Sequence, residues 1–263
     1  MAKSLHPSTL FHFTIMSENF FNILDEGRFK PFLAREHIKG MGRGGSRNFG
    51  VPMVSFCDIR LSQLDEHTIK YGEFGFGLTK EWAEKNSLHP VLYMSKNSTV
   101  FSVYNQRMRV LKNALVPLWN DRKNLKGKDK LTFNKLKSEY GDLYNLLRYM
   151  KNYRGKLIQG GELKDENFIF ADEKEWRYVP EPFVGDIWPS MDLSKIESRE
   201  DKLFHSSKFS SFSIDFTLND IKYIIIPDDS YTSEVMGYLR DYDGFDENML
   251  SKILTMQQVK ADF

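Results

Sequence analysis

A long stretch with helical periodicity and composition, from about Ser98 to Asn152, separates two parts of the chain that are rich in strand-like runs. Strands and helices are mixed in both parts, without the regular strand–helix repeat of a doubly wound parallel sheet. This order predicts an α+β fold with a largely antiparallel or mixed sheet. We expect one domain over residues 1–263, in which residues 98–156 form a basic helical insertion and residues 231–263 form C-terminal helices.

The strand-like runs are short and apolar. Before the insertion they are Leu10–Phe13, Val51–Ile59, Phe74–Leu78 and the run VLYM after Pro90. After the insertion they are Asn167–Phe170, Glu173–Val179, Phe212–Phe216 and Lys222–Pro227. We expect the first two runs of this second group to be neighbouring strands joined by a tight turn. The two C-terminal helices are predicted over Tyr231–Arg240 and Glu247–Val259.

Local start and stop signals refine the N-terminal region. Ser17 is a suitable cap for a helix over Glu18–Glu26, and Gly27 suits a left-handed residue that ends it. The segment His37–Gly50 contains five glycines in the basic run KGMGRGGSRNFG. A run of this kind predicts either mobility or closeness to a ligand.

Charge is distributed unevenly, although the net charge is only +1. Arg107–Lys156 carries 14 Lys and Arg against 4 Asp and Glu, a balance of +10. The segment from Asp172 to Phe263 carries 10 against 19, a balance of −9. The two segments either neutralise each other inside one fold, or the basic one faces a polyanion such as a nucleic acid.

Composition places the chain among globular proteins of the cytoplasm. Apolar residues make up 41% and charged residues 28% of it, and no apolar run reaches the roughly 18 residues of a membrane helix. The first residues, MAKSLHPSTLFHF, lack the features of a secretion signal. Cys57 is the single cysteine, which fits a reducing compartment.

The common catalytic motifs are missing from the sequence. It has no P-loop, no GxGxxG before a helix, no HExxH and no CxxC. The six histidines show no metal-ligand spacing. We therefore expect no metal site.

The stretch DEKEWRYVPE, from Asp172 to Glu181, is the most unusual strand-like run. Strand alternation places Glu173, Glu175 and Arg177 on one face, with Trp176 and Tyr178 on the other. The polar face is either a catalytic pair of carboxylates, with one kept ionised by the arginine, or an edge strand whose Glu–Arg pair lies in water.

Two further positions are candidates for chemistry. His12 lies in the first strand, where a histidine is most often a core or edge residue with a satisfied hydrogen bond. Tyr71 precedes Gly72 and a Gly-rich strand, an arrangement that suits either a ring beside a cleft or a simple turn. Each signal is weak when it is taken alone.

Several of these segments in order resemble the AbiGi family of abortive phage infection proteins. The segments are LFHFT, ILDEGRFKP, VPMVSFCDI, YGEFGFGLTKEW, HPVLYM and DEKEWRYVPE. The same order is similar to a divergent branch of the ADP-ribosyltransferase superfamily, with an early histidine, a mid-chain Tyr-Gly and a late Glu-x-Glu strand. The resemblance implies an ADP-ribosyltransferase-like split sheet of mixed or antiparallel strands. It covers Leu10 to about Met94 and Asn167 to about Pro227.

The resemblance also implies roles for particular residues, with NAD as the substrate. His12 would bind a ribose, Tyr71 would stack on nicotinamide, and Glu175 or Glu173 would be the catalytic carboxylate. Further contacts with NAD would come from a second set of residues, Phe13, Thr14, Ser55 and Arg177. The sequence departs from the toxin members of that superfamily in two ways. It has no arginine beside His12, and Val54-Ser55-Phe56 stands where those proteins have a Ser-Thr-Ser triplet.

Three functions are compatible with this resemblance. The first is phage defence by ADP-ribosylation of a macromolecular target, a protein or a nucleic acid contacted through Arg107–Lys156. The second is an inactive transferase fold that acts as an antitoxin or sensor by binding a cognate partner protein. The third is an enzyme that hydrolyses NAD or a related nucleotide.

Overall fold

The computed structural model describes residues 7–42, 44–159, 161–181 and 191–262. Its centre is a sheet with the strand order β14-β13-β5-β1-β4-β11-β6, and β3 pairs with β4 beside this path. All pairs of this sheet are antiparallel except β13 with β14. The prediction of an α+β fold with a mixed, largely antiparallel sheet is therefore confirmed.

Most strands are short. Their bounds are β1 Thr9–Thr14, β2 Arg28–Phe29, β3 Phe32–Lys39, β4 Ser46–Cys57, β5 Phe74–Thr79, β6 His89–Pro90, β7 Leu92–Met94, β8 Met150–Asn152, β9 Arg154–Gln159, β10 Glu162–Ile169, β11 Glu175–Tyr178, β12 Ile214–Asp215, β13 Ile221–Ile226 and β14 Ile253–Thr255. Three small pairings lie outside the central sheet, β10 with β9, β12 with β2, and β7 with β8.

The helices range from single turns to 21 residues. The α-helices are α1 Ser17–Glu26, α2 Leu64–Tyr71, α3 Lys80–Lys85, α4 Val100–Asn120, α5 Gly127–Leu147, α6 Arg199–Ser206, α7 Thr232–Leu239 and α8 Met256–Asp262. The 3₁₀ helices are η1 Leu61–Gln63, η2 Phe170–Glu173, η3 Leu193–Lys195, η4 Ser207–Phe212, η5 Asp229–Tyr231 and η6 Glu247–Lys252.

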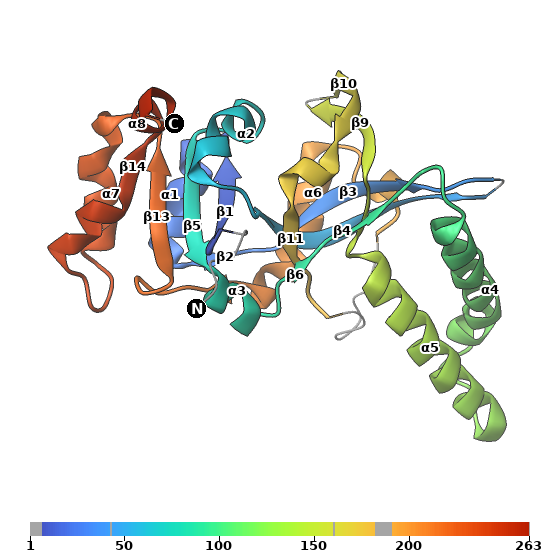
Figure 1. Ribbon diagram of the computed structural model, residues 1–263. Coiled ribbons are helices and arrows are strands. Elements are labelled where there is room, and N and C mark those ends of the chain that lie inside the picture. Colours follow the sequence, from blue (N-terminus) through green and yellow to red (C-terminus); the bar gives the residue numbers. More distant parts are fainter. Residues whose placement is uncertain (1–6, 43, 160, 182–190, 263) are drawn as a thin grey trace, which may run out of the picture.

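The central sheet narrows between β1 and β4. These strands share one residue pair, Phe11 with Cys57, whereas β1 pairs with β5 over six residues and β3 with β4 over eight. The sheet thus has two halves that meet at this narrow junction, which we call the seam. Figure 1 shows the first half with α1, α7 and α8 around it, and the second half with α4, α5 and α6.

Alternating side chains of the first half supply two separate cores. Leu10 and Ile224 point into a large aromatic core with α1, α3 and α7, whereas their neighbours Phe11 and Ile225 point into a core with α2 and α8. Successive strand residues face opposite sides of a sheet. Helices therefore cover this half on both faces, which explains why its strands read as continuous apolar runs.

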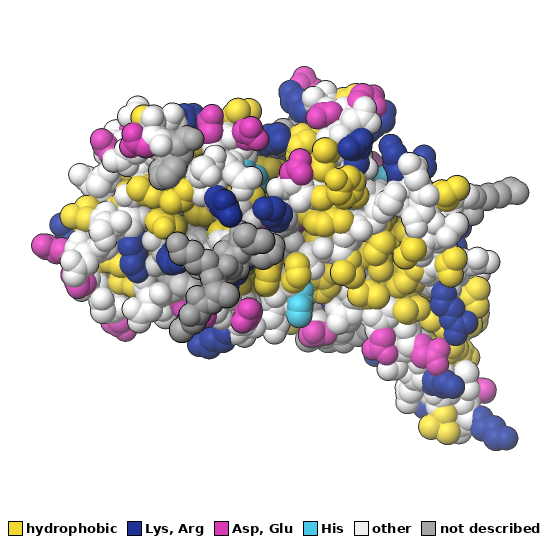
Figure 2. Space-filling view, viewed as in Figure 1, with side chains coloured by type: hydrophobic (Ala, Val, Ile, Leu, Met, Phe, Trp, Pro, Cys, Tyr) yellow, Lys and Arg dark blue, Asp and Glu magenta, His cyan; other side chains and the backbone are white. Residues whose placement is uncertain are grey.

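Helices α4 and α5 form an antiparallel hairpin that packs against β3 and β4. Buried residues of α4, including Met108 and Leu111, join Phe49 and Val51 of β4 in one apolar cluster. The free end of the hairpin projects from the body of the molecule (Figure 1). On the face seen in Figure 2, Lys and Arg side chains of this projection alternate with Asp and Glu and with apolar patches.

Several sequence predictions hold in detail. The helical segment, the first strands and the left-handed Gly27 at the end of α1 (φ 63°) are confirmed. Thr79 caps α3, since its hydroxyl accepts a hydrogen bond from the backbone N–H of Trp82. The residue before α1 is Met16, without a side-chain cap, so the prediction that Ser17 caps this helix is wrong.

Other expectations are wrong at segments whose structure is determined by pairing with distant strands rather than by the local sequence. Strand β10 pairs with β9, whereas β11 pairs with β4 and β6, so the two are not neighbouring strands. The reason is that η2 and the left-handed Lys174 (φ 43°) turn the chain between them. Residues 247–259 form η6, β14 and α8 rather than one helix, because Ile253–Thr255 pairs in parallel with β13.

The Gly-rich segment, expected to be either mobile or close to a ligand, is mostly part of a strand pair. Residues His37–Lys39 and Ser46–Gly50 belong to the β3–β4 hairpin, which leaves a short turn between them. Arg43 of this turn lies outside the described residues, as do residues 1–6 of the segment considered for a secretion signal. Residues 150–156 at the end of the expected insertion belong mostly to strands. Within the described ranges, no helix is long and apolar enough to span a membrane.

Candidate functional site

Strand β11 carries the candidate site, and its two faces differ as alternation predicts. It lies between β4 and β6, with Glu175 opposite Cys57 and Arg177 opposite Ser55. Trp176 and Tyr178 pack against the large aromatic core. Glu175 and Arg177 are 6% and 0% exposed. The alternative of an edge strand with a solvated ion pair is therefore wrong.

The carboxylate of Glu175 is surrounded by donors. Its Oε1 accepts hydrogen bonds from Arg177 Nε at 2.6 Å and from Ser55 Oγ at 2.8 Å. Its Oε2 accepts from Lys151 Nζ at 2.7 Å and from Arg177 Nη2 at 3.2 Å. A carboxylate has about four lone-pair sites, so protein donors already occupy the accepting capacity of this side chain.

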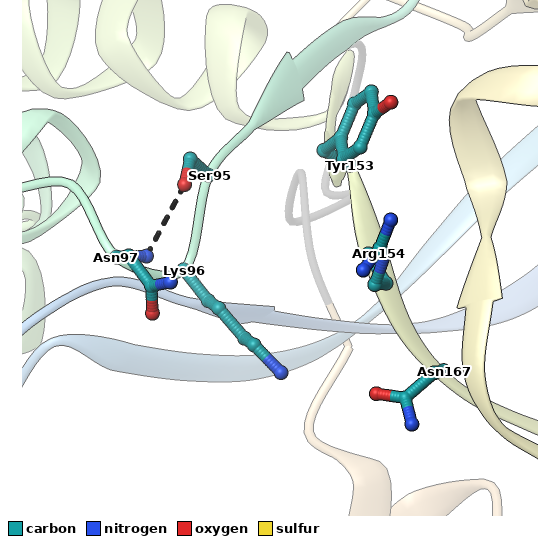
Figure 3. A pocket seen from close by; sticks show the side chains of 6 residues that line it. All are labelled: Ser95, Lys96, Asn97, Tyr153, Arg154 and Asn167. Carbon is teal, nitrogen blue, oxygen red and sulfur yellow. Dashed lines mark hydrogen bonds between the residues drawn. The ribbon is translucent and has the colours of Figure 1, made fainter.

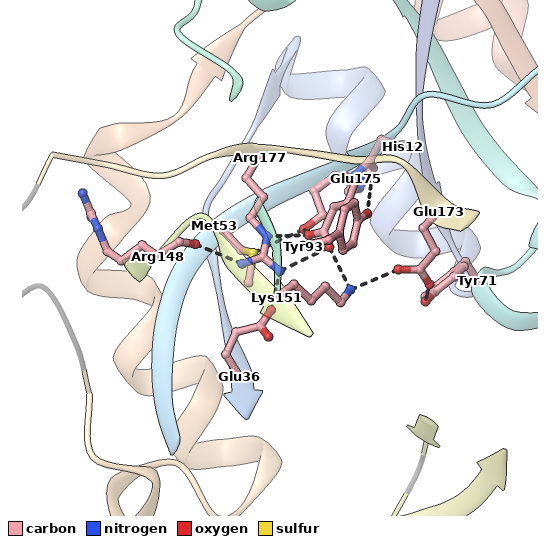
Figure 4. Close-up of polar contacts among 11 residues, drawn as sticks. His12, Glu36, Met53, Tyr71, Tyr93, Arg148, Lys151, Glu173, Glu175 and Arg177 are labelled. Atoms are coloured by element: carbon pink, nitrogen blue, oxygen red, sulfur yellow. Dashed lines mark hydrogen bonds and ion pairs between the residues drawn. The ribbon is translucent and has the colours of Figure 1, made fainter. Parts of the chain in front are cut away.

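Arg177 connects Glu175 with the rest of the second half-sheet. Its Nη2 donates to Glu36 of β3, and its Nη1 donates to the carbonyl oxygen of Arg148 at 2.9 Å. Glu36 is itself buried. Figure 4 shows the guanidinium of Arg177 between Glu175, Glu36 and the chain at Arg148.

Lys151 of β8 links the two carboxylates of the Glu-x-Glu pair. Its Nζ lies 2.7 Å from Glu175 Oε2 and 3.0 Å from Glu173 Oε2. The other oxygen of Glu173 accepts a hydrogen bond from the hydroxyl of Tyr71, at the end of α2. The buried cluster thus contains three carboxylates, Glu36, Glu173 and Glu175, and two cations, Lys151 and Arg177.

Electrostatics fixes the ionisation of four side chains of the site, Glu175, Lys151, Arg177 and Tyr71. Burial alone would raise the pKa of Glu175, but Arg177 and Lys151 outweigh it and hold that pKa well below its usual range. Burial alone would lower the pKa of Lys151 and of Arg177, but Glu175 with its acidic neighbours raises both. Burial and the charge of Glu173 raise the pKa of Tyr71. At neutral pH the Glu175 carboxylate and both cations are ionised, and Tyr71 keeps its proton.

His12 reaches the cluster through Ser55, at the seam. The Nδ1 atom of its ring hydrogen-bonds the carbonyl oxygen of Ser55 at 2.9 Å, while the Ser55 hydroxyl donates to Glu175. The ring packs against Phe29 and Phe56, with centroids 5.1 and 5.4 Å away. Burial lowers the pKa of His12, opposed by the bond to Ser55. His12 is therefore neutral and held by the core.

The ring of Tyr71 already has a partner. His67, one turn earlier in α2, lies with its ring centroid 4.6 Å from that of Tyr71 and 5.4 Å from that of Phe13. Burial, followed by the charges of Lys70 and Lys151, lowers the pKa of His67 to about 4. The predicted nicotinamide-stacking residue thus packs on a neutral histidine.

The structure brings together most of the residues predicted from the sequence. His12, Ser55, Tyr71, Glu173, Glu175 and Arg177 form one connected network. Phe13 and Thr14 lie outside this network. Phe13 packs in the core with α2 and α8, and the hydroxyl of Thr14 accepts a bond from the backbone N–H of Met16 at 3.3 Å.

Sequence reasoning missed four members of the site. Glu36 and Lys151 complete the charge balance, Tyr93 accepts a hydrogen bond from the backbone N–H of Glu175 at 2.9 Å, and Arg148 supplies its carbonyl. The sequence carries no signal for any of the four: Lys151 lies in a short strand between Met150 and Asn152, and only the structure shows that these two neighbours are buried.

Comparison with known proteins identifies the family. Residues 46–227, which is 182 of 263, match the sequence model of the family described as "Putative abortive phage resistance protein AbiGi, antitoxin". The chain belongs to the AbiGi family. The chain is also 26% identical over 239 residues to "Abortive phage resistance protein AbiGi" of Lactococcus lactis subsp. cremoris. This match covers 81% of this chain and 89% of that protein. No solved structure matches this AbiGi-family protein.

The expected AbiGi resemblance is thus confirmed, whereas the ADP-ribosyltransferase-like fold and NAD as a substrate stay predictions. The arrangement of the side chains does not fit the roles that NAD chemistry would require of Glu175. A ribose hydroxyl needs a free acceptor within hydrogen-bond reach, and both oxygens of Glu175 are occupied by Ser55, Lys151 and Arg177.

Proposed function

We propose that this protein is a non-enzymatic antitoxin of abortive phage resistance, which acts by binding a partner protein. The AbiGi family description supports an antitoxin role. The observation that carries the proposal is the state of Glu175, whose two oxygens accept four hydrogen bonds inside the protein. A carboxylate in this state serves the fold rather than a substrate.

The position of the cluster explains what it does for the fold. Its side chains come from β3, β4, β8, β11, η2 and α2, and Ser55 continues it to His12 on β1, across the seam. Removing one partner of a buried ion pair is strongly destabilising, even where the pair itself adds little stability. The cluster therefore holds the two half-sheets in a single relative arrangement and keeps the partner-binding surface in shape.

The test is co-expression with the toxin that this antitoxin would neutralise, with growth and co-purification as readouts. The variant is Glu173→Gln, which removes one carboxylate charge but keeps an amide oxygen for Lys151 and an amide N–H that can donate to the Tyr71 hydroxyl. Lys151 also keeps Glu175 as its counter-charge, so this substitution leaves no buried cation unpaired. We expect Glu173→Gln to co-purify with the partner and to restore growth as the wild type does. If the folded variant still binds the partner but no longer restores growth, the antitoxin proposal is wrong.

A second candidate function is ADP-ribosyl transfer from NAD to a macromolecule. It is supported by the convergence of His12, Tyr71 and Glu173 near the seam, and by the spare accepting capacity of Glu173, which receives one bond on each oxygen. In this case Glu173, rather than Glu175, is the catalytic carboxylate. The measurement is nicotinamide release from NAD in a cell lysate, which Glu173→Gln must abolish while the fold is retained.

A further inference from the structure

A surface pocket of about 320 Å³ lies between the loop after β7 and the β9–β10 hairpin. Its lining residues all carry a polar group, and they are Ser95, Lys96, Asn97, Tyr153, Arg154 and Asn167. Figure 3 shows Lys96 on one side of the opening, with Arg154 and Asn167 on the other. The pocket is separate from the Glu175 cluster, but Tyr153 follows Lys151 by only two residues.

The two cations of the pocket, Lys96 of the loop after β7 and Arg154 of β9, differ from the other basic residues of the β9–β10 hairpin. Lys156 pairs with Glu166 at 3.1 Å, and Lys164 pairs with Glu162 at 2.6 Å. Among the described residues, no carboxylate lies within ion-pair distance of Lys96 or Arg154. Two positive charges therefore face the same small volume, and no carboxylate of the described ranges neutralises either of them.

The backbone of the pocket is fixed although its side chains are accessible. The N–H of Tyr153 donates to the carbonyl of Met94 at 2.9 Å, and its carbonyl accepts from Ala171 at 3.3 Å. Arg154 pairs with Ile169 in the β9–β10 ladder. Tyr153 is 46% exposed, so the chain presents an aromatic ring beside the two cations at a defined place.

We propose that this pocket binds one nucleotide unit, with its phosphate between Lys96 and Arg154 and its base on the ring of Tyr153. Lysine and arginine are the usual partners of phosphate oxygens, and bases stack on exposed aromatic rings without sequence preference. Asn97 and Asn167 supply amides for the sugar or the base edge. The +10 balance of Arg107–Lys156, which includes Tyr153 and Arg154, attracts such a ligand over longer distances.

The size of the pocket favours a nucleotide over an acidic peptide. Ligand pockets start at about 300 Å³, which is enough for a single unit of a strand or a free mononucleotide. A peptide carboxylate would use the two cations but would leave the Tyr153 ring and the amides without a role. The inference is independent of the antitoxin proposal, because no residue of the pocket belongs to the Glu175 cluster.

The experiment measures fluorescence anisotropy of a labelled single-stranded oligonucleotide of about 12 nucleotides with the full-length protein. We expect the double variant Lys96→Ala, Arg154→Ala to weaken binding by at least about tenfold and to reduce the slope of log affinity against log salt by about 1.4. Tyr153→Ala should weaken binding by about tenfold, whereas Tyr153→Phe should leave it unchanged.

The matched control is the double variant Lys156→Ala, Lys164→Ala, which removes the same charge from paired positions of the same hairpin. It should leave the salt slope unchanged. Competition with AMP distinguishes the two possible ligands, a free mononucleotide and one unit of a strand. Displacement of the oligonucleotide by AMP assigns the pocket to a mononucleotide, and lack of displacement assigns it to a strand. The proposal is overturned if the oligonucleotide does not bind, or if both double variants weaken binding equally.

Discussion

At the scale of single residues, Glu175 is a buried charge that the surrounding side chains must compensate. It is 6% exposed and accepts hydrogen bonds from Ser55, Lys151 and Arg177. The free-energy cost of burying an unpaired carboxylate is very high. A glutamate can therefore occupy this position of the strand only because these donors bind it. The arginine two residues away pairs with Glu175 and holds it in the fold.

The first prediction concerns this side chain. Glu175→Gln keeps the shape of the residue but leaves Lys151 and Arg177 with one counter-charge fewer, so we expect the free energy of unfolding to fall by about 3–5 kcal/mol. Urea denaturation followed by circular dichroism measures this change. The control is Glu162→Gln, in the exposed pair with Lys164, which should change the free energy by no more than about 0.5 kcal/mol. Equal effects of the two substitutions would refute the structural role.

The second prediction concerns His67 and pH. Its pKa is lowered to about 4 in the folded protein, against about 6.5 in the unfolded chain. Between about pH 6.5 and about pH 4, His67 binds a proton in the unfolded chain but not in the folded protein. The free energy of unfolding therefore decreases as the pH falls through this range. The residue accounts for about 3 kcal/mol of this decrease.

His67→Phe retains a ring against Tyr71 and Phe13 but cannot bind a proton. Urea denaturation at several pH values should therefore show a shallower decrease for the variant than for the wild type. A smaller decrease remains, because burial also lowers the pKa of His12. Identical pH profiles would show that His67 does not titrate as its environment indicates.

At the scale of elements, the junction between α2 and β5 positions Tyr71. Gly72 ends α2 with φ of +90°, and a Cβ atom there would lie 2.4 Å from the carbonyl oxygen of Thr14 and 2.5 Å from the Cα of Ile15. The glycine thus allows the end of the helix to touch the end of β1. The sequence signalled a turn at Tyr-Gly, but only the packing reveals this close approach.

The third prediction follows from this contact. Gly72→Ala combines an unfavourable φ with a clash against backbone atoms, so we expect a loss of about 2 kcal/mol or more in the free energy of unfolding. Gly127→Ala is the control, since Gly127 also has a positive φ of 51°, but a Cβ atom there would meet no described atom within 4 Å. It should cost only about 1 kcal/mol. Denaturation curves for the two variants that coincide would contradict the account.

The α4–α5 hairpin is part of the second core rather than an appendage. Leu111 is 4% exposed in the cluster with β3 and β4, whereas its neighbour Val110 is 54% exposed. The fourth prediction is that Leu111→Ala lowers the free energy of unfolding by about 3 kcal/mol, while Val110→Ala changes it by less than about 0.5 kcal/mol. Thermal and urea denaturation measure both, and an equal response would show that the hairpin is not packed as described.

At the scale of the whole molecule, local patterns predicted most elements but not how distant segments meet. Alternation in residues 173–178 correctly separated Glu175 and Arg177 from Trp176 and Tyr178, because each face of β11 meets a different environment. The same reasoning could not find Lys151, whose place depends on the pairing of β8 with β7. It also missed β14, because a three-residue strand is determined by its partner β13 rather than by its own period.

The two halves of the sheet meet at a narrow seam, and the Glu175 cluster lies beside it. In the account proposed above, this cluster is a structural centre and the protein works through its surfaces. The alternative places NAD chemistry at the same residues. The two accounts differ in whether a carboxylate oxygen of the cluster can accept a hydrogen bond from a ribose hydroxyl of NAD. The answer depends on how all the side chains of the cluster are paired, rather than on one side chain.

Calorimetric titration of the folded protein with NAD tests this claim most directly. Because Ser55, Lys151 and Arg177 occupy both oxygens of Glu175, we predict that the double variant Lys96→Ala, Arg154→Ala, in which the surface pocket cannot contribute, shows no saturable binding up to about 1 mM NAD, the upper end of typical KM values. Saturable binding that is lost in Tyr71→Ala and Glu173→Gln, both shown to be folded, would contradict the account.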